Sequence, residues 1–240
     1  MMDSDRRTAV VVGALFISAT VASLLGAIAL GSVLEGPDYL LDLSGHGSRV
    51  IAAVLLYLIA ASSAFATAFL LLPILRRHAE GLAVGYVVLR TFENVFYVAS
   101  CVALLMMLTI SQSDAITMAS PAQVPLLGAA LLAFQDWSVL IGTLIFFGLG
   151  SLALNYVLYR SRLVPRWLSA WGIVAAPLAF LYGLLGIFGV GTGLGSPFML
   201  LAMPIALQEL VFAVWLIAKG FLRHEVILEQ PQRSHVGVPT

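Results

Sequence analysis

Charged side chains are scarce in this sequence. Asp, Glu, Lys and Arg make up 10% of its 240 residues, and 61% of the residues are hydrophobic, whereas about 25% of an ordinary soluble domain is charged. The mean hydropathy of +1.03 excludes the soluble class and predicts an integral membrane protein. The formal net charge is zero, so no overall field would attract nucleic acid. The lipid bilayer is the partner that this composition predicts.

Cysteine and membrane-buried histidine are scarce as well. Cys101 is the single cysteine, which excludes a disulfide within the chain and a thiolate metal cluster. The four histidines lie outside the apolar segments, although histidine is the usual general base and metal ligand. The HExxH pattern of zinc metalloproteases and the GxSxG pattern of serine hydrolases are missing. The sequence therefore gives no sign of either chemistry. We therefore assign no catalytic residue, no metal site and no cofactor, and an intramembrane enzyme is the less favoured hypothesis.

Six apolar segments are long enough to cross a bilayer, which takes about 20 residues. They run over residues 9–34, 50–75, 82–110, 126–159, 167–190 and 198–222. Backbone groups must be bonded internally in hydrocarbon, and the segments lack the alternation of barrel strands, so each is predicted to be a helix. The fold class is therefore an all-α, polytopic transmembrane bundle of six helices. It forms one domain over residues 1–225, with a short mobile cytoplasmic tail over 226–240.

Cationic residues are concentrated on one side of the predicted membrane, in every second connection between the segments. They gather at the two chain ends and in the loops after the second and fourth segments, at Arg6, Arg7, Arg76, Arg77, Arg160, Arg162, Arg166, Lys219 and Arg223. The opposite loops hold several acids but only Arg49 among cations. By the positive-inside rule both termini are predicted to be cytoplasmic. The protein is expected to be a multi-pass protein of the cell inner (cytoplasmic) membrane.

Four ionisable side chains interrupt the apolar segments: Arg90, Glu93, Asp136 and Glu209. A charge at the centre of a membrane helix costs about 2.5–3.5 kcal/mol on insertion scales, so these groups are expected to face a protein or aqueous interior. Asn94 and Gln208 adjoin them in sequence. These six residues are the candidate ligand- or ion-binding site.

The depth of three of these charges is similar. Arg90 and Glu93 are three residues apart and share one helix face. Counted from the cytoplasmic end, Glu93 lies about 18 Å deep and Glu209 about 15 Å, at 1.5 Å per residue. Asp136 lies about 30 Å from that side in a straight helix. It is therefore expected towards the outer surface, where it joins the site only if the helix tilts or breaks.

Several hypotheses account for these charges. One cation and three acids leave an excess negative charge, so at least one acid is expected to be protonated unless a cation binds. The group could be a structural network that locks helices together, a proton- or cation-linked small-molecule transport site, or a ligand sensor. Glu93 and Glu209 each lie on the third helix of a triplet, which is reminiscent of inverted three-helix repeats in transporters. Glu93 or Glu209 would then titrate, with Arg90 as the counter-ion.

Small residues recur every fourth position in the first segment, at Ala14, Ser18, Ala22 and Gly26. This spacing lets membrane helices approach closely. It indicates packing within the bundle or, alternatively, the face of a homo-oligomer.

Three stretches resemble a bacterial family of six-span membrane proteins known as domain of unknown function 4386. They are RRTAVVVGALFISATVASLLG, YRSRLVPRWLSAWG and LAMPIALQELVFAVWLIAKGF. The chain is similar also in its RTFEN motif, from Arg90 to Asn94, and in the acid–Trp pair of Asp136 and Trp137. Similar proteins often have Asn-Glu where this chain has Gln208 and Glu209. The resemblance implies the six-helix fold and a bacterial membrane location, but no established activity.

Overall fold

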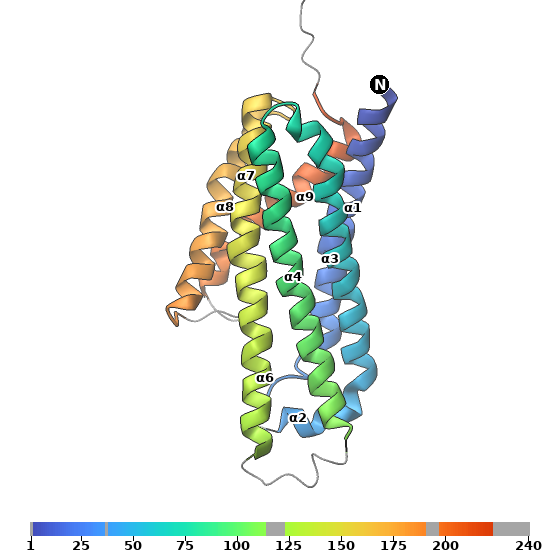
Figure 1. Cartoon of the computed structure of the whole chain (residues 1–240), viewed down its shortest axis with the longest axis vertical. Helices are drawn as coiled ribbons and strands as arrows, with labels where there is room; N and C mark the ends of the chain where they lie inside the picture. The colour runs from blue at the N-terminus through green and yellow to red at the C-terminus, as the bar shows by residue number, and fades with distance from the viewer. Residues whose placement is uncertain (1, 37, 114–122, 191–196, 223–240) are drawn as a thin grey trace, which may run out of the picture.

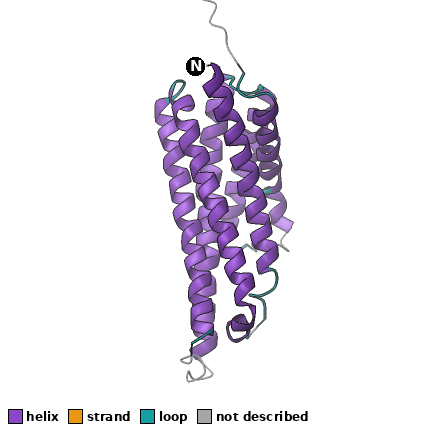
Figure 2. Cartoon of the chain, turned by 90° about the vertical axis from the view of Figure 1, so that its right-hand side faces the viewer, coloured by secondary structure: helices purple, strands orange, loops and turns teal. Residues whose placement is uncertain are grey.

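The computed structural model describes residues 2–36, 38–113, 123–190 and 197–222. Over these residues the chain is helical and has no strand, and six helical segments are long and apolar enough to cross a membrane. The predicted all-α bundle of six spans is thereby confirmed. The helices run along the long axis of an elongated molecule (Figures 1 and 2). The tail predicted over 226–240 lies outside the described residues.

The helices begin and end close to the predicted boundaries. The described elements are α1 (Met2–Leu30), α2 (Tyr39–Asp42), η1 (Leu43–His46), α3 (Gly47–Arg76), α4 (Glu80–Ser111), α6 (Gln123–Leu140), η2 (Ile141–Phe146), α7 (Phe147–Ser161), α8 (Arg166–Ile187), η3 (Pro197–Leu201) and α9 (Met203–Ala218). The fourth span is continuous through α6, η2 and α7. The short helices α2 and η1 occupy a stretch that was predicted to be loop.

The six spans close into a ring. Each span packs against its neighbours in the sequence, in the order α1, α3, α4, α7, α8 and α9, and α9 packs back against α1. The third and sixth spans, α4 and α9, therefore stand on opposite sides of the ring. Side chains from these two helices can meet only across the interior of the bundle.

Both ends of the transmembrane domain lie at the same end of the bundle. Arg6 near the start of α1 donates hydrogen bonds to the carbonyl oxygens of Leu216 and Ile217, at 3.0 and 2.7 Å. These carbonyls belong to the last turn of α9, where a helix leaves acceptors unsatisfied and favours a cation. We call this end of the bundle the terminal end and the opposite end the far end.

Two glycines permit unusually close helix contacts. A Cβ atom on Gly13 of α1 would lie 2.7 Å from the carbonyl oxygen of Ala213 in α9. A Cβ atom on Gly172 of α8 would lie 2.2 Å from the side chain of Asn155 in α7. Because lipid supplies no hydrophobic drive for helix pairing, such contacts provide the dispersion attraction that closes the ring.

The outward faces of the helices carry large apolar side chains. Exposed examples are Leu24, Ile28, Leu55, Phe92, Val95, Leu126, Val174 and Val214. Polar and charged side chains in the same helices are mostly turned inward, as a lipid environment requires. The bundle therefore presents an apolar belt to the bilayer and keeps its chemistry inside.

Candidate functional site

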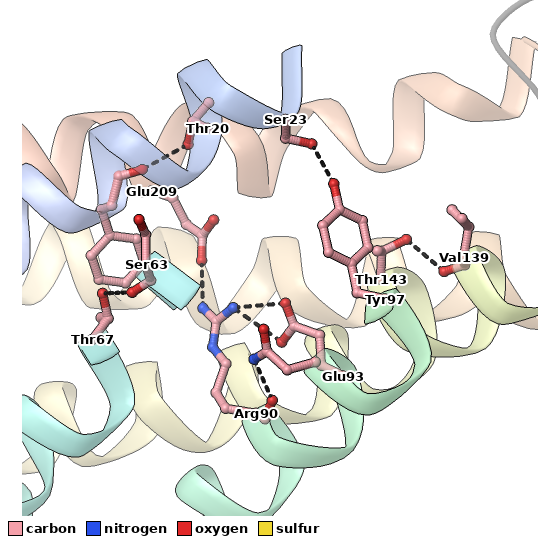
Figure 3. Close-up of polar contacts among 12 residues, drawn as sticks. Thr20, Ser23, Ser63, Thr67, Arg90, Glu93, Tyr97, Val139, Thr143 and Glu209 are labelled. Carbon is pink, nitrogen blue, oxygen red and sulfur yellow. Dashed lines mark hydrogen bonds and ion pairs between the residues drawn. The ribbon is translucent and has the colours of Figure 1, made fainter. Parts of the chain in front are cut away.

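Arg90 links two carboxylates that come from opposite helices. On α4, Arg90 Nη1 donates to both carboxylate oxygens of Glu93, each at 3.0 Å. Its Nη2 donates to Glu209 Oε1 of α9 at 3.1 Å (Figure 3). The side chains of Arg90, Glu93 and Glu209 are 4%, 12% and 17% exposed. We call these three residues the Arg90 cluster.

Aromatic rings surround the guanidinium of Arg90. Its Cζ atom lies 5.1 Å from the ring centre of Phe147, 5.7 Å from that of Tyr86 and 5.9 Å from that of Phe16. Cation–π attraction of this kind contributes most where the cation is desolvated. The rings come from three helices, so Arg90 is held near the axis of the ring rather than against one wall.

A π-helical segment, η2, brings the fourth span against Glu93. A Cβ atom on Gly142 of η2 would lie 3.1 Å from the carbonyl oxygen of Glu93 and 2.9 Å from Phe96 Cβ. Phe146 stacks on Phe92 and Phe96 with ring centres 5.1 and 5.7 Å apart. Single π-helical turns inside α-helices occur often at functional sites. Here the turn changes the helix register so that the next residue, Phe147, faces Arg90.

Several hydrogen-bonding atoms around Arg90 have no hydrogen-bond partner within the part of the protein that the structure describes. Among the described residues, Arg90 Nε and the Tyr86 hydroxyl are fully buried without a hydrogen-bond partner. Glu209 accepts its one hydrogen bond through Oε1, so its second oxygen has no partner in the described part of the chain. Two carboxylates facing one guanidinium leave one excess negative charge when all three are ionised. In a low-dielectric interior that charge needs a proton or a cation.

The remaining predicted site residues make no hydrogen bond or ion pair with the side chains of the Arg90 cluster in the described part of the chain. Asn94 is half-buried and donates through Nδ2 to the Arg90 backbone carbonyl at 2.7 Å, within its own helix. Asp136 is exposed on α6 and makes no ion pair with any described residue. In the described ranges, no three His, Cys, Asp or Glu side chains gather as metal ligands.

Gln208 belongs to a second polar group. It is 1% exposed and donates through Nε2 to Asn155 Oδ1 at 3.0 Å and to the Leu168 carbonyl at 3.2 Å. Asn155 donates in turn to the Ser151 carbonyl at 2.9 Å. This amide network joins α7, α8 and α9 and fixes the rotation of α9 one residue before Glu209.

Sequence reasoning missed several contributors to the site. Tyr86 lies four residues before Arg90, and Tyr97 four residues after Glu93, so one helical stripe carries all four groups. That spacing could have indicated both tyrosines. Asn155, a lone amide in an apolar segment, could have been identified by the same burial argument as Arg90. Phe147 carried no comparable signal, because aromatic residues are common on every face of these helices.

Comparison with known proteins identifies a family. The family model described as "Domain of unknown function (DUF4386)" matches residues 11–220. No curated protein and no solved structure matches the chain. The chain therefore belongs to the domain of unknown function 4386 family, as its RTFEN motif and flanking stretches indicated.

Proposed function

We propose that the Arg90 cluster binds a proton or a small cation and links this binding to passage of a small molecule through the bilayer. The observation that carries the proposal is that one guanidinium serves two carboxylates from opposite helices. The excess negative charge makes the centre a site for one positive charge. The unpartnered second oxygen of Glu209 is the atom that would receive it.

The two carboxylates have different roles in this proposal. Glu93 offers both oxygens to Arg90 Nη1 on its own helix, so this pair persists whatever happens on the other side of the ring. Glu209 contributes one oxygen from α9. Protonation of Glu209, or capture of a cation by it, weakens the ion pair between Arg90 and Glu209 that joins α4 to α9 across the interior. Binding of one positive charge is thereby linked to the separation of two helices.

Few other titratable groups face the cluster. The nearest are the hydroxyls of Tyr86 and Tyr97 on α4, and Tyr57 of α3 contacts the Tyr97 ring at 5.6 Å between centres. The side chains that α1 and α7 place here, Phe16 and Phe147, do not titrate. Any proton exchanged near neutral pH should therefore come from Glu93 or Glu209.

Proton release on cation binding tests the proposal. Purified protein in detergent and weak buffer is titrated with salts of monovalent cations while a pH dye reports released protons. Because the excess charge is one, the wild type should release up to about one proton per molecule. Glu209→Gln should release none, whereas Glu80→Gln, at an exposed carboxylate, should behave as the wild type. Equal release by wild type and Glu209→Gln would overturn the proposal.

A structural role is the second candidate. It is favoured by the near-complete burial of Arg90 and by its bond across the ring. A lock of this kind would make Glu209→Gln less stable in detergent and would leave no proton exchange in the wild type. The titration therefore separates the two functions, since only a site that exchanges charge can release protons.

A further inference from the structure

The interior of the bundle differs on the two sides of Arg90. Towards the terminal end it is filled by side chains at most 5% exposed: Val12, Phe16, Leu71, Leu154, Phe212 and Leu216. Phe16 and Phe212 meet edge to face with centres 5.4 Å apart. Side chains buried to this extent are closed off from solvent, as in an ordinary close-packed core. The terminal side of the cluster is therefore sealed in this conformation.

Towards the far end the cluster is followed by hydroxyl groups. Thr20 lies one turn beyond Phe16, Tyr97 one turn beyond Glu93, and Thr143 one turn before Phe147 in a span of opposite direction. Phe16, Glu93 and Phe147 all contact Arg90. Their neighbours therefore form one level about 6 Å further towards the far end. With Ser23, these residues make up the hydroxyl layer.

The hydroxyl layer is rich in hydrogen-bond acceptors. Thr20 and Thr143 donate to carbonyl oxygens of their own helices, at 3.0 and 2.7 Å, which leaves their oxygen lone pairs free to accept. The Tyr97 and Ser23 hydroxyls are 3.0 Å apart and connect α4 with α1 (Figure 3). All four residues are half-buried, in contrast to the sealed core on the other side of Arg90.

The wall of the ring is also lower on this side. Glu209 is 12 residues from the start of the sixth span at Pro197, whereas Glu93 is 18 residues from the end of α4, about 27 Å. The short spans α8 and α9 end well before α4 and α6 at the far end (Figure 1). Towards the far end, α4 thus extends further beyond the Arg90 cluster than the sixth span, which carries Glu209.

These contacts point to a ligand class, in an argument that rests on the proposed function. Carboxylate and hydroxyl oxygens on adjacent levels of the bundle interior are complementary to a cation that carries several N–H donors. A transition metal ion such as Zn²⁺ would need three or more close carboxylate, thiolate or imidazole ligands, and no such group occurs among the described residues. We propose that a small primary ammonium ion enters from the far end, passes the Tyr97–Ser23 bond, and binds between the hydroxyl layer and the free oxygen of Glu209.

Competition between two cations tests the ligand class. Methylammonium and tetramethylammonium carry the same charge, but only the first has N–H donors. In the proton-release titration, methylammonium should act at a concentration at least about tenfold lower, the usual effect of one charge-assisted hydrogen bond. Thr143→Val should reduce this advantage, because it removes one hydroxyl acceptor from the hydroxyl layer. Equal potency of the two cations on the wild type would overturn the ammonium site, whereas absence of any proton release would overturn the proposed function itself.

Thiol labelling tests the route without reference to ligand binding. In a Cys101→Ala background, Thr143→Cys should react with a charged, membrane-impermeant methanethiosulfonate reagent added from the far-end side of sealed vesicles. Leu71→Cys, at a fully buried position on the terminal side, should not react from either side. Tyr97→Phe removes the hydrogen bond between Tyr97 and Ser23 that the ligand must pass. This variant should raise the labelling rate of Thr143→Cys severalfold. Labelling of Thr143→Cys only from the terminal-end side, or not at all, would overturn the route.

Discussion

Arg90 compensates two acids at once, so its removal has a larger effect than removal of either acid. Arg90→Gln leaves Glu93 and Glu209 facing each other across the ring without a counter-ion. Breaking a buried ion pair by deleting one partner costs about 3–5 kcal/mol. We expect a correspondingly lower unfolding temperature in detergent for this variant.

Two companion variants identify the cause of that loss. Replacing all three members of the Arg90 cluster by Gln removes the uncompensated charge, so most of the lost stability should return. Arg77→Gln removes an exposed cation 3.4 Å from Asp5, and surface pairs contribute about 0–1 kcal/mol. A triple variant that is less stable than Arg90→Gln would contradict the charge argument.

Gln208 offers a contrast at the adjacent position. Gln208→Leu leaves Asn155 Oδ1 without the hydrogen bond that it accepts at 3.0 Å. An unsatisfied buried polar group costs about 1–3 kcal/mol, so thermal stability should fall. The amplitude of proton release should persist, because the Gln208 side chain donates its hydrogen bonds to Asn155 and Leu168 and not to the Arg90 cluster. Loss of proton release at unchanged stability would place Gln208 in the binding site instead.

At the scale of elements, the π-helical segment η2 sets how the fourth span meets α4. Gly142→Leu would place side-chain atoms where the Glu93 carbonyl and Phe96 Cβ lie, since a Cβ atom alone would approach them to 3.1 and 2.9 Å. Overpacking of this kind costs about 1–3 kcal/mol, and it should also displace Phe147 from Arg90. We expect both a lower unfolding temperature and a weaker proton response.

Gly85→Ala is the matched control for this substitution. Gly85 lies on α4, and a Cβ atom there would have nothing within 4 Å. Its unfolding temperature should equal that of the wild type or exceed it slightly, because alanine is the better helix former by about 1 kcal/mol. If Gly85→Ala and Gly142→Leu were equally stable, η2 would not be the contact that positions the span.

The helices themselves could be predicted from the sequence, whereas the rotation of each helix about its own axis could not. Hydropathy indicated all six spans, because an apolar helix of bilayer length has few alternatives. The cost of burying charge likewise identified Arg90, Glu93 and Glu209. Residue spacing gives depth along a helix, which already placed Asp136 towards the outer surface, but it gives no rotation about the helix axis, so the separate environment of Gln208 had no sequence signal. The π-turn at η2 changes the register of α7 in a way that no hydrophobic period reveals.

For the whole molecule, the ring arrangement makes orientation a testable property. Arg6 and the end of α9 are in contact, so both ends of the domain must lie on one side of any membrane that it spans. The charge pattern predicts that this side is the cytoplasm. A reporter that is active only in the cytoplasm should be active when fused after residue 240, and one active only outside should be inactive.

Inserting cationic residues into the uncharged sequence at 191–197, between the fifth and sixth spans, makes this test more stringent. Positive charge placed there competes with the arginines of the opposite loops for the cytoplasmic side. The cytoplasmic reporter signal should therefore decrease as arginines are added. A signal that starts low in the wild type and rises with added arginine would show the reverse orientation.

The pairing of Arg90 with Glu93 within one helix bears on the biogenesis of the protein. During translation Arg90, in the third span, is made 119 residues before Glu209. A salt bridge between positions three apart lets that span partition into lipid as an electrically neutral unit. Glu209 is synthesised last and pairs with a guanidinium that is already in the membrane. The final helix therefore carries the excess negative charge of the Arg90 cluster. We expect this helix to be the slowest to insert into the membrane.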